Sequence, residues 1–114
     1  MSPMDDIPAT EDPVYEAKVI RAFVRGDRLR SIPARERKKR VILRFLLDRV
    51  FPDLDPVDER DVNMRLALWH HDVSSLRRYL VDSGLVTRQG MVYRRALPLP
   101  EPRAEERPGG PPFV

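Results

Sequence analysis

The fold is decided by residues 72–95, which read DVSSLRRYLVDSGLVTRQGMVYRR. Asp72 is a favoured helix-capping residue, because its carboxylate can accept a hydrogen bond from a free N–H at the start of a helix. Gly84 suits the position just past the end of a helix, where a positive φ is common. Between these two residues, apolar side chains recur at the spacing of one helix face, at Val73, Leu76 and Leu80. The segment therefore predicts a helix from Asp72 to Ser83.

A β-hairpin is predicted directly after this helix. Residues 85–88 (LVTR) and 91–95 (MVYRR) are β-type runs, and Gln89 and Gly90 lie between them. Glycine is typical of a short hairpin turn, which needs a positive φ. Further upstream, residues 28–32 (RLRSI) alternate basic and apolar side chains, which predicts a short strand. We expect this strand to pair with the hairpin.

Three more helices are predicted ahead of residue 72. The first covers residues 14–24 and is followed by Gly26 as its C-terminal glycine. The second covers residues 33–50, with proline first, and its later turns are apolar almost all round, so it is the expected core helix. The third follows Asp58 and Asp61, which resemble a capping box, and its buried stripe is Val62, Leu66 and Trp69.

The predicted order is helix, short strand, helix, helix, helix and hairpin. A chain of this kind is mainly α with a small β-hairpin, and the order is that of a winged helix-turn-helix. In that arrangement the helix before the hairpin enters the major groove of DNA, and the hairpin, or wing, lies against phosphate or the minor groove.

Proline is concentrated at the two ends of the chain. Nine of the twelve prolines lie before Val14 or after Leu97. Because proline fixes φ and donates no backbone hydrogen bond, such segments are typically extended and flexible. We therefore expect three regions: an acidic flexible N-terminal segment (1–13), a winged-helix domain (14–97) and a proline-rich disordered tail (98–114).

Composition argues against several classes of protein. The chain has no cysteine, hence no thiolate metal site or thiol nucleophile, and no apolar run near the roughly 20 residues of a membrane span. Asp58 and Asp61 fit helix capping better than two-carboxylate catalysis. His70 and His71 are expected to point in different directions, so we do not expect them to share a metal. We expect a cytoplasmic protein that is not an enzyme and has no cofactor, no metal and no membrane partner.

Positive charge gathers in two segments, although the net charge is only +3. Residues 1–17 carry five acidic side chains and no basic one, whereas residues 18–49 carry twelve basic and three acidic ones. Residues 85–95 add three arginines. Such clustering is typical of a protein that binds a polyanion.

The predicted contacts to double-stranded DNA lie on three elements. The core helix offers five cations that can each neutralise a phosphate: Arg35, Arg37, Lys38, Lys39 and Arg40. The helix before the hairpin offers arginines, which match guanine edges, and serines, which suit phosphate or bases: Ser74, Ser75, Arg77 and Arg78. The hairpin adds Arg88 and Arg94. One of the two helix arginines is expected to pair internally with Asp82 or Glu59, which leaves the other for the partner.

Short motifs run through most of the predicted domain: GDRL (26–29), IPA (32–34), KKRVIL (38–43), ERDVN (59–63), HD (71–72), LRRYLVD (76–82), GL (84–85) and YR (93–94). Together they resemble the bacterial family catalogued as domain of unknown function 2087. The resemblance implies a winged helix-turn-helix-like fold. It also implies a place among transcriptional regulators, because family members occur alone or appended to other helix-turn-helix regulators.

We therefore expect a bacterial transcriptional regulator that binds duplex DNA. The alternative is a protein-interaction module that docks on the transcription machinery or another regulator, through the winged fold or its tails. Proline-rich segments are pre-ordered for such docking. The third alternative is self-association as a homodimer without nucleic acid, since isolated winged domains often need a dimer to reach useful affinity.

Overall fold

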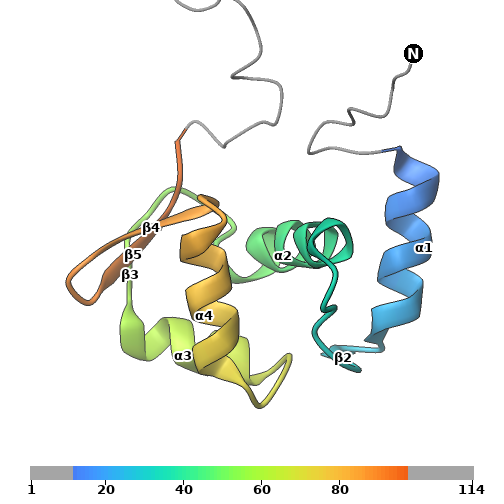
Figure 1. The fold of residues 1–114 in the computed structure, drawn as a ribbon. Coiled ribbons are helices and arrows are strands. Elements are labelled where there is room, and N and C mark those ends of the chain that lie inside the picture. Colours follow the sequence, from blue (N-terminus) through green and yellow to red (C-terminus); the bar gives the residue numbers. More distant parts are fainter. Residues whose placement is uncertain (1–11, 98–114) are drawn as a thin grey trace, which may run out of the picture.

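The computed structural model describes residues 12–97, which form four helices and two small antiparallel sheets (Figure 1). In chain order the elements are α1 (Pro13–Phe23), β1 (Val24–Arg25), β2 (Arg28–Leu29), α2 (Glu36–Val50), β3 (Val57–Asp58), α3 (Glu59–Ala67), α4 (Val73–Asp82), β4 (Val86–Gln89) and β5 (Val92–Arg95). The four predicted helices are confirmed, but the fold is mixed α/β, because the hairpin pairs with β3 and a second small sheet forms from β1 and β2. The predicted tail (98–114) and most of the predicted N-terminal segment (1–13) lie outside the described residues.

The first small sheet corrects the prediction for residues 24–32. Val24 leaves α1 in an extended conformation, and β1 pairs with β2 so that Val24 lies opposite Leu29. Gly26, with a φ of 64°, lies in the turn between these strands and not at the helix end. The expected pairing of residues 28–32 with the C-terminal hairpin is therefore wrong. Pairing of β2 with its sequence neighbour β1 closes a much shorter loop than pairing with the C-terminal hairpin would, so it costs less chain entropy.

The C-terminal hairpin is confirmed and gains a third strand. β4 pairs with β5, and Gly90 in the turn between them has a φ of 64°. On its other side β5 pairs with β3, with Val57 opposite Tyr93, so the strand order is β3-β5-β4. Asp58 is both the last residue of β3 and the N-cap of α3. Because β3 is only two residues long, it shows no alternation from which a strand could be predicted.

Capping chemistry sets the starts of α3 and α4 as predicted. The Asp58 carboxylate accepts a hydrogen bond from the backbone N–H of Asp61 (2.9 Å), and Asp72 does the same for Ser75 (3.2 Å). The predicted start of α2 is three residues too early, and its N-cap, Arg35, makes no side-chain capping bond. The residues before α2 (PAR) include no favoured capping side chain, so the local sequence defines no sharp start.

α2 is the core helix, as expected, and it lies between α1 and α4 (Figure 1). Six of its side chains are buried: Val41, Ile42, Leu43, Leu46, Leu47 and Val50. The residues outside α2 that complete the core are Val19, Leu29, Phe51, Val57, Val62, Leu66, Leu76, Leu80, Leu85, Val86 and Tyr93. Since Leu76 and Leu80 take the inner face of α4, polar side chains such as Ser74, Arg77 and Arg78 are left on the side beside the hairpin.

Candidate functional site

α4 presents all four of its predicted contact residues at the surface. Ser74 and Arg78 are exposed, and Ser75 and Arg77 are half-buried. The start of the helix is fixed by Asp72, since hydrogen bonds from the Ser75 side chain and backbone lower the pKa of the Asp72 carboxyl. The cap therefore stays ionised at neutral pH, which holds the position of the first turn.

An open hollow of about 290 Å³ lies between α4 and the C-terminal hairpin. We call it the α4–hairpin hollow, and its lining residues are Ser74, Arg77, Arg78, Val81, Asp82, Arg88 and Tyr93. Four of the predicted DNA contacts meet there: Ser74, Arg77 and Arg78 from α4, and Arg88 from β4. Three of the seven side chains are arginines, so the hollow is predominantly basic.

Two arginines of the hollow have partners within the protein. Arg77 Nη1 donates to Asn63 Oδ1 at 2.5 Å. Arg88 Nη2 lies 3.5 Å from Glu59 Oε1, and Arg88 Nε donates to the Gly90 carbonyl at 2.8 Å. Arg77 or Arg78 was expected to pair with Asp82 or Glu59. The ion pair with Glu59 is made by Arg88 of the hairpin instead.

Glu59 ties the start of α3 to the hairpin. Its N–H donates to the Met91 carbonyl at 2.8 Å, and its carboxylate accepts a hydrogen bond from the Tyr93 hydroxyl at 2.6 Å. This bond, aided by the charges of Arg77 and Arg88, lowers the pKa of Glu59. Burial, then the bond to Glu59, raises the pKa of Tyr93. Sequence reasoning gave Glu59 only as an ion-pair partner, because its tie to Tyr93 depends on the β3–β5 pairing.

The predicted hairpin arginines share a second hollow, on the outer side of the hairpin. Arg88 and Arg94 line it together with Thr87, Gln89 and Val92, and its volume is also about 290 Å³. Arg94 is exposed, and within residues 12–97 its guanidinium makes no hydrogen bond or ion pair. Arg94 is therefore a cation that is open to an external partner.

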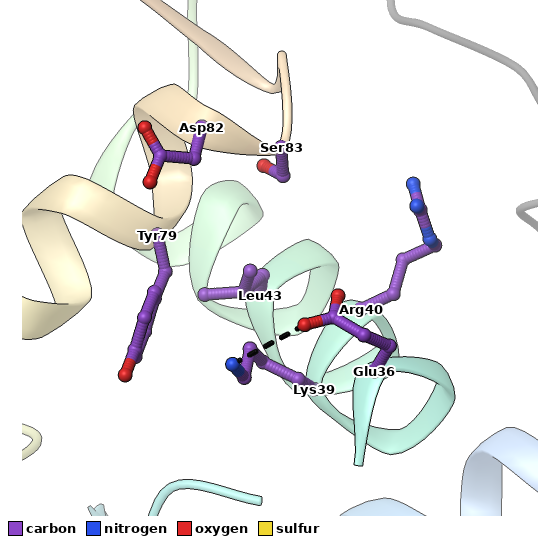
Figure 2. Close-up of a pocket in the computed structure, with 7 residues that line it drawn as sticks. All are labelled: Glu36, Lys39, Arg40, Leu43, Tyr79, Asp82 and Ser83. Carbon is purple, nitrogen blue, oxygen red and sulfur yellow. Dashed lines mark hydrogen bonds and ion pairs between the residues drawn. The ribbon is translucent and has the colours of Figure 1, made fainter. Parts of the chain in front are cut away.

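Figure 2 shows where the basic run of α2 meets the end of α4. Lys39 Nζ lies 3.4 Å from Glu36 Oε2 and 4.1 Å from the centre of the Tyr79 ring, and the Lys39 side chain is only 14% exposed. The Arg40 side chain extends away from Tyr79 (Figure 2). The hollow here has a volume of about 280 Å³, and the rest of its lining is Leu43, Asp82 and Ser83. Lys39 thus has two internal partners, which compete with any phosphate.

The other cations of the basic run do not line this hollow. Arg37 lies 4.1 Å from the centre of the Tyr15 ring of α1. Arg35 is the exposed N-cap residue, and Lys38 is half-buried. Successive residues of a helix differ by about 100° in direction. The five cations therefore cannot all face one ligand, although the sequence shows them as one block.

The structure brings six of the predicted residues into two adjoining groups. Asp82 lines both the α4–hairpin hollow and the hollow of Figure 2, so the two lie side by side at the end of α4. One group is Ser74, Arg77, Arg78 and Arg88, and the other is Lys39 and Arg40. Arg94 adjoins the first group through Arg88, whereas Arg37 lies toward α1.

The histidine pair between α3 and α4 differs from the expectation. His70 and His71 stack, with ring centroids 4.4 Å apart, because this segment is a turn and not a helix that would separate them. His70 Nδ1 accepts a hydrogen bond from the Asp72 N–H at 3.0 Å. In the described part of the chain, no three metal-ligating side chains are grouped together. No helix there has the length and apolar character needed to cross a membrane.

The sequence profile of the DUF2087 family, described as an uncharacterized protein conserved in bacteria, matches residues 28–95. The chain therefore belongs to this bacterial family, as the motifs predicted. No curated protein and no solved structure matches the chain. The matched range begins at β2 and ends with β5, so it contains both hollows beside α4.

Proposed function

We propose that this chain is a winged helix DNA-binding protein that regulates transcription in bacteria. The fold supports the proposal through the order α2-β3-α3-α4-β4-β5, in which the strand ahead of α3 pairs with the last strand. α3 and α4 are then the helix-turn-helix pair, and α4 is the helix for the major groove. The wing is the β4–β5 hairpin, and β3 takes the sheet position that residues 28–32 were expected to fill.

The α4–hairpin hollow is the observation that carries the proposal. It places three arginines where the outer face of α4 meets the hairpin, and Arg94 continues this basic surface along the outer side of the hairpin. The planar guanidinium pairs with two phosphate oxygens, or with the O6 and N7 atoms of guanine. A basic surface shared by the helix and the wing is what binding to duplex DNA requires.

A fluorescence anisotropy titration with a labelled random-sequence duplex tests the proposal. We expect the logarithm of the affinity to fall linearly with log salt, by about 0.9 for each phosphate neutralised. Arg78→Ala is the informative variant, because Arg78 is exposed and its removal leaves the core intact. Arg21→Ala removes an exposed arginine from α1 and is the matched control, which should bind as the wild type does.

The outcome for Arg78 also assigns its role. A loss of about 1–3 kcal/mol on one preferred sequence indicates a base contact, whereas equal weakening on all sequences indicates a phosphate contact. Absence of binding at about 50 mM salt would refute the proposal, because non-specific attraction to phosphate is strong there.

A second candidate function is a protein-interaction module that docks on the transcription machinery or another regulator. Two apolar side chains favour it: Met64 of α3 and Leu68, the C-cap residue of that helix, lie four residues apart and are 61% and 68% exposed. Binding to purified bacterial RNA polymerase, compared between the wild type and Leu68→Asp, checks this candidate. Loss of polymerase binding together with unchanged duplex binding would support it.

A further inference from the structure

The shape of the α4–hairpin hollow suits a phosphate group better than a base. A duplex presents its phosphates as protruding groups, whereas base edges lie at the floor of a groove and are reached by projecting side chains. The hollow is concave and its arginines converge from two elements, with Arg77 and Arg78 from α4 and Arg88 from β4. Its volume of about 290 Å³ lies at the lower limit of small-molecule sites, so it has room for a phosphate group.

Two of the three arginines are held in place in the free protein. Asn63 holds one nitrogen of Arg77, while Glu59 and the Gly90 carbonyl hold Arg88. A guanidinium carries five N–H donors, so these bonds leave further donors for phosphate oxygens. A side chain that is already positioned loses less rotamer entropy when it binds a ligand.

The charges around the hollow fit a ligand with a single negative charge. Three arginines line it, and they are opposed by Asp82 in the lining and by Glu59 beside Arg88. One positive charge therefore remains, which matches the one negative charge of a phosphodiester.

We infer that the α4–hairpin hollow binds one phosphate group through Arg77, Arg78 and Arg88, with Asn63 and Glu59 as positioning residues. When the phosphate belongs to a nucleic-acid backbone, the inference rests on the proposed function. The other source of the same chemistry is a free phosphorylated molecule. Arg77 contacts phosphate in either case and does not read a base.

The first experiment compares the salt dependence of duplex binding in Arg77→Gln, Arg88→Gln and the control Arg21→Gln. Each change in the hollow should reduce the slope of log affinity against log salt by up to about 0.9 and should weaken all sequences alike. Arg21→Gln should leave the slope unchanged. Asn63→Ala keeps every charge, so it should weaken binding at an unchanged slope, which identifies a positioning role. Circular dichroism melting shows that each variant is folded.

The second experiment needs no DNA. The Nε–Hε signals of the arginine side chains are followed by NMR while inorganic phosphate is added, with sodium chloride at equal ionic strength as the control. Signals of Arg77 and Arg88 should move with phosphate and not with chloride, whereas the Arg21 signal should stay in place.

The two experiments together separate this inference from the proposed function. Reduced slopes support a backbone phosphate in the hollow. A phosphate response without duplex binding supports the site with a free phosphorylated ligand and refutes the proposed function. Duplex binding with unchanged slopes in folded Arg77→Gln and Arg88→Gln overturns the inference and leaves the proposed function intact. Absence of both responses overturns both.

Discussion

Replacement of Leu76 by alanine tests how much the buried inner face of α4 contributes to the stability of the fold. Leu76 is fully buried (0% exposed) and directly precedes Arg77 in the helix. A leucine-to-alanine change at such a site costs about 2–5 kcal/mol, since it removes buried apolar atoms and leaves a cavity. The whole free energy of unfolding of a small domain is about 5–15 kcal/mol. At about 4–8 °C per kcal/mol, even the smaller loss lowers the Tm by about 8–16 °C.

Urea unfolding followed by fluorescence measures this loss, because Trp69 is the one tryptophan of the chain. Trp69 is half-buried and packs edge-on against Phe45, with ring centroids 5.6 Å apart, so unfolding changes its environment. The matched control is Leu68→Ala, the same chemical change at a side chain that is 68% exposed. The control should stay within about 0.5 kcal/mol of the wild type. Equal losses in the two variants would refute the assignment of Leu76 to the core.

Two further predictions concern protonation. Tyr93→Phe removes the hydroxyl that donates to Glu59, so NMR titration should show the pKa of Glu59 raised toward its ordinary value; an unchanged pKa would contradict the assigned cause. Because the folded-state pKa of Glu59 is lowered, its ionised carboxylate stabilises the folded protein at pH values above the ordinary pKa of 4.5. This stabilisation is lost as the pH falls through the folded-state pKa, so the urea midpoints of Tyr93→Phe and the wild type should converge there. The pKa of His70 is lowered by burial and by His71, so stability should decline as the pH falls from the ordinary value of 6.5 toward the folded pKa. His70→Asn cannot titrate and should flatten this decline; an identical pH profile of the urea midpoint would count against the role of His70.

The helix ends and turns could be predicted where a single residue type determines them. Asp58 and Asp72 cap the helices that they were expected to cap, because the capping bond depends only on the next few residues. Gly84 and Gly90 have positive φ values of 83° and 64° for the same local reason. Gly26 was expected to follow the end of a helix, but its positive φ belongs to the turn between β1 and β2.

The partners of strands and of charged side chains could not be predicted in the same way. Val57 pairs with Tyr93 across a long stretch of chain, and a two-residue strand carries no pattern of its own. The same holds for the candidate site: the contact of Glu59 with the hairpin depends on the pairing of β3 with β5, so it could not be predicted either. Arg37 and Lys39 were expected to face phosphate, but aromatic rings from α1 and α4 lie within reach of them. Only the packing of the helices reveals such rings.

The shared position of Asp58 limits how the length of this chain can vary. Asp58 ends β3 and caps α3 with no linker between them. One inserted residue at this point would turn α3 by about 100° relative to the sheet, or would move the buried side of β3 to solvent. The turn just before it, residues 52–56, is exposed throughout and can absorb such changes. We therefore expect insertions and deletions among family members to fall within residues 52–56 and to spare the β3–α3 junction.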